Sequence, residues 1–293
     1  MESLLSPREL ADALGVSESS IKRWVDGGEL AALRTAGGHR RIARSEAVRF
    51  ARTRGALPVR PELLLFGGAR VEEAGLDDAH RSAAFHRALL DDDRSRALGL
   101  LNSAFLAGAS IATLCDGPIR FALERIGELW MHDSKGILYE HRATDICMHA
   151  LGFLRNALPP PAPDAPVAVG SAAADDPYLL PSMMCAITLA ELGFRDVNLG
   201  PRTPVATTLA AIETYRPLLV WHTASVGGED VVPLASGIRR FVESSASPEI
   251  RLLVGGRAIA GNSLPSGVAV LATMGELQAF ARALLPAAAR TVR

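Results

Sequence analysis

Apolar residues at helical spacing predict two short helices in the first 30 residues. Ser6 is a suitable N-cap for the first helix, Glu9 can close a capping box with it, and Gly15 ends the helix. Ser17 can cap the second helix. The apolar stripe of this second helix has the i, i+3, i+4 spacing of a buried face: Ile21, Trp24 and Val25. Two helices joined by a tight Gly-Val-Ser turn are typical of a helix-turn-helix.

Helical spacing returns between residues 79 and 158, after a polar connector over residues 55–78. The apolar positions fall into four amphipathic segments: Phe85, Leu89 and Leu90; Leu98, Leu101, Phe105 and Leu106; Ile119, Leu123, Ile126 and Leu129; and Ile146, Leu151 and Leu154. Four such segments separated by short breaks predict a compact four-helix bundle.

The pattern changes after the proline-rich segment 159–163, which neither a helix nor a central strand could include. Short apolar runs then alternate with helix-like segments: 167–173, 197–199, 218–223, 251–254 and 268–272. This alternation predicts a Rossmann-like, doubly wound parallel sheet. Ligands of such sheets bind at the carboxyl ends of the strands. The loops expected there are 174–181, 200–204, 225–229 and 255–261.

Charge becomes informative only when it is divided along the chain. The whole chain carries 31 basic and 32 acidic residues, a net charge of −1, which alone argues against a nucleic-acid-binding protein. Between Leu30 and Arg60, however, eight arginines accompany one acidic residue, Glu46. A small basic region therefore adjoins the predicted helix-turn-helix. The candidates for base contacts on the exposed face of its second helix are Ser19, Lys22 and Arg23.

The sequence also indicates the cellular location of the protein and the state of its cysteines. The N-terminal residues lack an export signal, and no run approaches the roughly 18 apolar residues of a membrane span. We therefore expect a cytoplasmic protein that has no membrane partner. Three widely spaced cysteines fit neither a disulfide framework nor a metal site, and we expect them to be buried and reduced: Cys115, Cys147 and Cys185.

The segment after the helix-turn-helix carries a first resemblance. Residues 35–42 are Thr-Ala-Gly-Gly-His-Arg-Arg-Ile, and this sequence resembles the winged-helix DNA-binding domain of the MerR family. The glycines permit a tight hairpin, and we expect His39, Arg40 and Arg41 at its tip. The basic residues expected to contact DNA phosphates are Arg34, His39, Arg40 and Arg41.

A second resemblance covers essentially the whole chain. Trp130 is followed, after nine residues, by Glu140 and His141, as in the Trp-x9-Glu-His signature of the light-responsive, cobalamin-binding MerR-type repressors (CarH/LitR-like). The resemblance implies that these three residues line the upper face of an adenosylcobalamin pocket. It also implies three domains in this order: a winged helix over residues 1–70, a helix bundle over 71–158 and a Rossmann-like cobalamin-binding-type domain over 165–293.

The predicted sheet domain keeps part of the ligand signature of these repressors. Ser225, Gly255 and Gly256 resemble the Ser and Gly-Gly elements that accommodate the nucleotide tail of cobalamin. The Asp-x-His-x-x-Gly motif aligns with residues 176–181, but Tyr178 replaces the His that binds cobalt from below. A phenol has a pKa of about 10 and is a hard oxygen donor. His ligation is therefore not available from this position.

Three alternatives for the ligand remain open from the sequence. In the first, cobalamin binds without His ligation, through the nucleotide pocket and the Trp130 wall. In the second, another flat chromophore such as a bilin or haem occupies the pocket, with Tyr178 as hydrogen-bond donor or iron ligand. In the third, the domain binds no cofactor and is a scaffold for oligomers.

The sequence as a whole predicts a DNA-binding transcriptional regulator and not an enzyme. Its expected partners are double-stranded operator DNA and further copies of the chain, as a dimer or tetramer, with a tetrapyrrole-type ligand or light as the signal. A cobalamin-dependent methyltransferase module is less favoured, because such enzymes need the His ligand and further domains. No catalytic residue and no metal site are predicted, since the remaining histidines lack partners at triad or metal-ligand spacing: His80, His86, His149 and His222.

Overall fold

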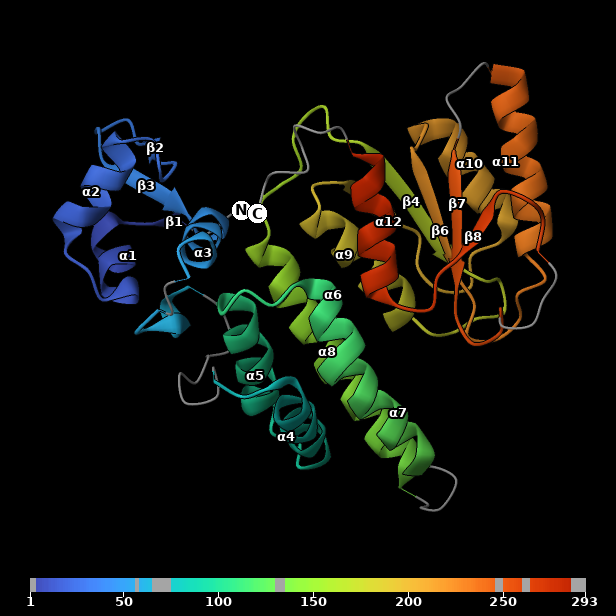
Figure 1. Cartoon of the computed structure of the whole chain (residues 1–293), viewed down its shortest axis with the longest axis horizontal. Coiled ribbons are helices and arrows are strands. Elements are labelled where there is room, and N and C mark those ends of the chain that lie inside the picture. Colours follow the sequence, from blue (N-terminus) through green and yellow to red (C-terminus); the bar gives the residue numbers. More distant parts are fainter. Residues whose placement is uncertain are drawn as a thin grey trace. The chain divides into compact units, whose positions relative to one another are not determined.

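The chain divides into two compact units, residues 1–159 and residues 160–293. The computed structural model describes residues 4–55, 58–64, 75–129, 135–245, 250–259 and 264–285. Figure 1 shows small helices with a β-hairpin and a bundle of longer helices in the first unit, and a sheet flanked by helices in the second. No helix in the described ranges is long and apolar enough to cross a membrane.

The first unit begins with the predicted helix-turn-helix, formed by α1 (Pro7–Leu14) and α2 (Glu18–Asp26). The Ser6 hydroxyl accepts a hydrogen bond from the Glu9 backbone N–H, and the Glu9 carboxylate accepts one from the Ser6 N–H. The predicted capping box is thus confirmed. Gly15 ends α1 with a φ of 67°, in the left-handed region that glycine adopts readily.

A small antiparallel sheet and a third helix complete the N-terminal part of the first unit, called the helix-turn-helix part below. Its elements are β1 (Leu4–Leu5), β2 (Leu33–Arg34), β3 (Arg40–Ala43) and α3 (Arg44–Thr53). The strand order is β1-β3-β2, and β2 and β3 form a hairpin, called the wing below. The helices and the sheet enclose a core whose fully buried members include Leu10, Ile21, Leu30, Ile42 and Val48. A 3-10 turn follows at Pro61–Leu63.

The predicted helix bundle occupies the rest of the first unit. Its helices are α4 (Asp78–Leu90), α5 (Arg94–Leu106), α6 (Ile111–Leu114), α7 (Arg120–Leu129) and α8 (Gly136–Ala157). Apolar residues predicted from helical spacing fill the core, among them Phe85 and Phe105, which are at most 1% exposed. Burial raises the pKa of the Cys147 thiol in this core to about 12. All three cysteines are buried and none of them forms a disulfide, as predicted.

The third helical segment of the bundle begins earlier than the sequence indicates. Pro118 lies just before the apolar positions of this segment, and proline usually interrupts a helix because it lacks the N–H that a helix interior needs. In the structure, Ser110 caps α6, and a π-helical turn over Cys115–Ile119 continues directly into α7. The wider turn accommodates the proline, since the Arg120 N–H reaches the carbonyl five residues before it.

The second unit is the predicted doubly wound parallel sheet. Its strands are β4 (Val167–Ala172), β5 (Arg195–Asn198), β6 (Leu219–Thr223), β7 (Arg251–Gly255) and β8 (Val268–Val270). They are all parallel, in the order β5-β4-β6-β7-β8. The direction of strand addition therefore reverses between β4 and β6, at a topological switch point of the flavodoxin-like kind.

Helices cover both faces of this sheet. They are α9 (Leu180–Glu191), α10 (Val205–Tyr215), α11 (Val231–Ser245) and α12 (Met274–Leu284). Helices α9 and α12 pack on one face around Trp221, together with Leu189 and Leu277. Helices α10 and α11 pack on the other face, where Ile212 and Leu234 are fully buried. Figure 1 shows α12 and α11 on opposite sides of the strands.

Candidate DNA-binding surface and ligand-binding edge

The exposed face of α2 carries the three residues predicted to contact bases. Ser19, Lys22 and Arg23 are all exposed. Lys22 Nζ lies 2.7 Å from a carboxylate oxygen of Glu18, one helical turn away. Both partners of this pair are solvated, and such pairs are weak, so a DNA phosphate or base edge can replace Glu18. The face is therefore accessible and carries donors suited to DNA.

The wing places its basic residues differently from the prediction. The Thr35 N–H donates to the His39 carbonyl and the Gly38 N–H donates to the Thr35 carbonyl, so the tip of the hairpin precedes His39. His39 is exposed beside this tip. Arg40 and Arg41 lie within β3 and are half-buried, and their expected place at the tip is wrong. The reason is that β3 must pair with β2 for the hairpin to form.

Arg40 links the wing to α2. The strand register puts it directly opposite Arg34, and two like charges in that position repel each other. Asp26, the last residue of α2, compensates, because its Oδ1 lies 2.5 Å from Arg40 Nη2. Arg34 itself is exposed. The ion pair thus connects the wing to the helix that carries the base-contact candidates.

Part of the basic stretch makes contacts within the domain itself. The Arg54 guanidinium carbon lies 4.4 Å from the centroid of the Trp24 ring, and Arg54 also pairs with Glu29. Arg49 pairs with Glu46, with 2.6 Å between Nε and Oε2. The sequence pattern does not reveal these roles, because the partners of Arg54 lie 25 to 30 positions earlier.

Two of the three residues predicted for the upper pocket wall, Glu140 and His141, lie in the described part of the bundle. The third, Trp130, lies outside the described residues. Glu140 is half-buried and His141 is exposed near the start of α8. Ile137 and Leu138 beside them are 55% and 57% exposed. The first turns of α8 therefore present apolar side chains next to a carboxylate and an imidazole, a combination that suits an amphipathic ligand.

Asp176 organises the carboxyl end of the sheet. Its carboxylate is fully buried and accepts hydrogen bonds from two backbone N–H groups, those of Tyr178 at 2.9 Å and Ser225 at 2.5 Å. Its carbonyl accepts one from the Arg202 N–H at 2.9 Å. Asp176 therefore ties together the loops after β4, β5 and β6. Both of its carboxylate oxygens are occupied by these backbone bonds.

Tyr178 lies on the accessible side of the same edge. Its side chain is 39% exposed, and the Arg257 guanidinium carbon lies 5.7 Å from the centroid of its ring. Arg257 Nε also donates to the Ser225 carbonyl at 2.9 Å. The edge therefore presents a phenol and a cation side by side, held by the loops after β4, β6 and β7.

Gly255 and Gly256, at the end of β7, are both required by the fold itself. A Cβ on Gly256 would lie 2.2 Å from the Ala224 carbonyl oxygen, and Gly256 has a φ of 118°. A Cβ on Gly255 would lie 2.7 Å from the Leu271 carbonyl oxygen. The predicted Gly-Gly element is thus present, but neighbouring backbone accounts for it without a ligand.

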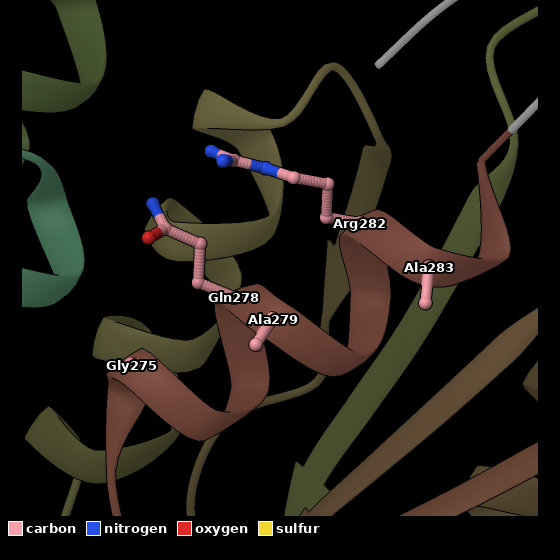
Figure 2. A pocket seen from close by; sticks show the side chains of 5 residues that line it. All are labelled: Gly275, Gln278, Ala279, Arg282 and Ala283. Carbon is pink, nitrogen blue, oxygen red and sulfur yellow. The ribbon is translucent and has the colours of Figure 1, made fainter. Parts of the chain in front are cut away.

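A shallow pocket in the second unit involves none of the predicted ligand residues. It lies along α12 and is lined by Gly275, Gln278, Ala279, Arg282 and Ala283. Figure 2 shows the Gln278 and Arg282 side chains extending from the same face of α12. Gln278 Nε2 is 3.4 Å from a carboxylate oxygen of Glu191 on α9.

Comparison with known families identifies two domains in the chain. Residues 4–55 match the helix-turn-helix domain, and residues 82–155 match the B12 binding domain. The chain carries a helix-turn-helix domain followed by a B12 binding domain. This combination supports a DNA-binding regulator with a cobalamin-binding sensor. No curated protein matches the sequence of this chain.

Three solved structures resemble this chain to different degrees. The monomethylamine corrinoid protein of Methanosarcina barkeri is 14% identical and has a TM-score of 0.50, and the match covers 69% of this chain and 96% of that one. A cobalamin-binding protein of Desulfitobacterium hafniense is 12% identical, with a TM-score of 0.35 over 70% of this chain and 98% of that one. The methanol:cobalamin methyltransferase complex of M. barkeri is 16% identical, with a TM-score of 0.35 over 73% and 82%. The first of these likenesses shows a shared helix-bundle and parallel-sheet fold.

Proposed function

We propose that the protein is a transcriptional regulator of the light-responsive, cobalamin-type MerR class, whose assembly and operator occupancy are set by a tetrapyrrole-type ligand or by light. Residues 1–70 bind DNA, and residues 71–158 and 165–293 form the sensor. The observation that carries the proposal is the presence, in one chain, of a helix-turn-helix domain with an exposed polar recognition face ahead of a B12 binding domain.

DNA binding follows the usual geometry of a winged helix. Helix α2 enters the major groove, where Ser19, Lys22 and Arg23 face the base edges. Arg34 and His39, both exposed on the wing, approach the phosphates beside it. Such domains bind as dimers or larger assemblies to repeated half-sites. A signal that changes the assembly therefore changes operator occupancy.

The donor set of the sheet edge does not fit a cobalamin that is ligated from below by histidine. Tyr178 stands where that imidazole is expected, and both Asp176 oxygens are bound to backbone N–H groups. His222 on β6 is 1% exposed, and its Nδ1 lies 3.0 Å from Ser171 Oγ inside the fold. The sheet edge therefore supplies no imidazole to such a ligand, and we assign Glu140 and His141, with Trp130, as the bundle's contribution to a tetrapyrrole site.

A bilin or haem is the second candidate ligand, and one specific observation favours it. Arg257 lies beside the exposed Tyr178 ring. A guanidinium pairs well with carboxylates, which haem and bilins carry on their periphery. The Tyr178 phenol is available as a hydrogen-bond donor or an iron ligand. A sensor domain that binds none of these ligands and acts as an oligomerisation scaffold is the remaining alternative.

The DNA-binding part of the proposal is tested with duplexes selected from a random pool by the full-length protein. Lys22→Ala and Arg23→Ala should each weaken binding of the selected duplex by about tenfold at moderate salt and reduce its salt dependence. Arg87→Ala is the matched control, because it removes one exposed arginine of the bundle helix α4. Equal affinities for all four proteins would exclude α2 as the recognition helix.

The sensor part is tested by absorbance spectra of protein purified from cells supplied with cobalamin and haem precursors, in the dark and in the light. We expect a bound chromophore. Its spectrum and the oligomeric state of the protein should both change with ligand or illumination. A colourless protein that takes up no cobalamin, bilin or haem would exclude the sensor function and leave the scaffold.

A further inference from the structure

A ligand can enter the second unit only where the space between the sheet and its helices is free, next to the switch point between β4 and β6. Strands β4 and β6 lie side by side, and the chain continues from them to opposite edges of the sheet. In open α/β sheets the crevice at such a point receives the ligand. A ligand can extend from this crevice into the interior only if the space between sheet and helices is free.

Trp221 fills this space on the face covered by α9 and α12. It is 1% exposed and is paired in register with Gly170 on β4. A Cβ on Gly170 would lie only 1.7 Å from Cε2 of the indole, so the ring rests directly on the backbone of β4. Trp221 Nε1 donates to Ser182 Oγ at 3.1 Å, and Ser182 donates to Asn198 Oδ1 at 2.7 Å. The polar end of Trp221 is therefore satisfied within the fold.

A buried polar cluster fills the same level on the opposite face. His222 follows Trp221 along β6, is 1% exposed and points the other way. Its Nδ1 lies 3.0 Å from Ser171 Oγ, which accepts a hydrogen bond from Thr208 Oγ1 at 3.1 Å. Ser171 and Thr208 are themselves at most 1% exposed. Both faces are thus closed one or two residues below the carboxyl ends of β4 and β6.

We infer that the sheet domain holds no part of its ligand between the sheet and its helices, and that the ligand lies on the carboxyl edge, over Tyr178 and Arg257. The inference rests on the proposed ligand-sensing function. It departs from the expectation that Ser225, Gly255 and Gly256 accommodate a nucleotide tail, since backbone contacts account for both glycines. The ligand class that fits is a tetrapyrrole without an inserted tail: a corrinoid that keeps its benzimidazole on its own cobalt, or a tail-less macrocycle.

The first test compares two corrinoids on the full-length protein, cobalamin and cobinamide, which lacks the nucleotide tail. We expect them to bind within about tenfold of each other, a difference of at most about 1.4 kcal/mol. We also expect the paramagnetic resonance spectrum of bound cob(II)alamin to keep the nitrogen splitting of its own benzimidazole. Loss of that splitting, together with a preference for cobalamin of several hundredfold, would show an inserted tail and overturn the inference.

The second test does not depend on corrinoid binding. Free 5,6-dimethylbenzimidazole should leave the unfolding temperature of the wild-type protein unchanged, because Trp221 occupies the space it would need. Trp221→Ala should create an apolar cavity bordered by the Ser182 hydroxyl, and an engineered cavity of this kind can take up a small aromatic molecule. Its unfolding temperature should therefore rise with added base. Leu189→Ala, a cavity in the same core without that hydroxyl, controls for lowered stability.

The two tests separate the inference from the function on which it rests. If neither corrinoid binds, cobalamin sensing fails, while the base titration still decides whether the interior is closed. If the base stabilises the wild-type protein, the interior is open and the inference fails, whatever the corrinoids do. The wild-type titration needs no variant, so it remains decisive even if Trp221→Ala does not fold, and Trp221→Phe then replaces it as the milder opening.

Discussion

The guanidinium carbon of Arg52 lies 3.8 Å from the centroid of the Phe105 ring, so a residue of the helix-turn-helix part is stacked on the core of the bundle. Arg52 Nη2 also donates to the Ala109 carbonyl at 3.1 Å. Phe105 is 1% exposed and belongs to α5, whereas Arg52 belongs to α3. This contact is a physical link between the helix-turn-helix part and the helices that match the B12 binding domain.

Replacement of Arg52 should loosen α3 from the bundle. Arg52→Ala removes a cation–π contact and a hydrogen bond, which together contribute about 2 kcal/mol. Arg52→Lys keeps the charge but loses the planar stacking, so it should fall between alanine and wild type. Hydrogen exchange of the α3 amides measures the effect. If exchange in Arg52→Ala equals that in the exposed-arginine control Arg87→Ala, Arg52 does not hold the two parts together.

Gly170→Ala should disrupt the sheet domain, because its new methyl group would collide with the Trp221 indole. Overpacking of a filled core costs about 1–3 kcal/mol, and this approach is closer than a small shift can relieve. Trp221→Ala in the same chain should remove the collision. We therefore expect the unfolding temperature of the double variant to fall by less than the sum of the decreases in the two single variants. Additive losses would mean that the ring does not rest on Gly170.

Local patterns explain why much of the fold could be predicted from the sequence. The capping box of Ser6 and Glu9 lies within four residues, and four strands of the sheet each coincide with one continuous apolar run. The exception is β5, Arg195–Asn198, which begins two residues before its predicted run because its first two residues are charged. The π-helical turn at Pro118 could not be predicted, because the usual effect of proline is to end a helix. The bundle around the turn supplies the contacts that keep the chain helical there.

The sequence predicts which types of residue belong to the candidate sites, but not which partners surround each of them. Tyr178 is found in the sequence at the position where the resemblance to cobalamin-binding repressors implies a histidine. In contrast, the double use of the Asp176 carboxylate depends on Ser225, 49 residues later. The position of Arg40 within β3 follows from strand register, and its partner Asp26 lies on another element. Such pairings arise only when distant segments fold together.

Asp176→Asn should destabilise the carboxyl edge of the sheet. An amide can accept with one oxygen only, so the N–H of Tyr178 or Ser225 would face the amide nitrogen. Bonds from a backbone N–H to a buried charged group contribute about 2 kcal/mol each. Asp175→Asn is the control, since it makes the same change of charge at the exposed neighbouring residue. Equal unfolding temperatures for the two variants would exclude a structural role for Asp176.

His222 should make the protein less stable in mild acid. Burial lowers the pKa of its imidazole below the ordinary value of 6.5, although Asp230 and Asp176 oppose the shift. The unfolded chain then binds a proton at higher pH than the folded chain, so stability is full above about pH 6.5 and falls as the pH drops toward the folded pKa. Urea unfolding across this range measures the loss. His222→Gln should flatten the dependence, whereas His149→Gln, at an exposed site, should not. If the free energy of unfolding changes with pH equally steeply in the wild type, His222→Gln and His149→Gln, His222 does not cause the loss of stability.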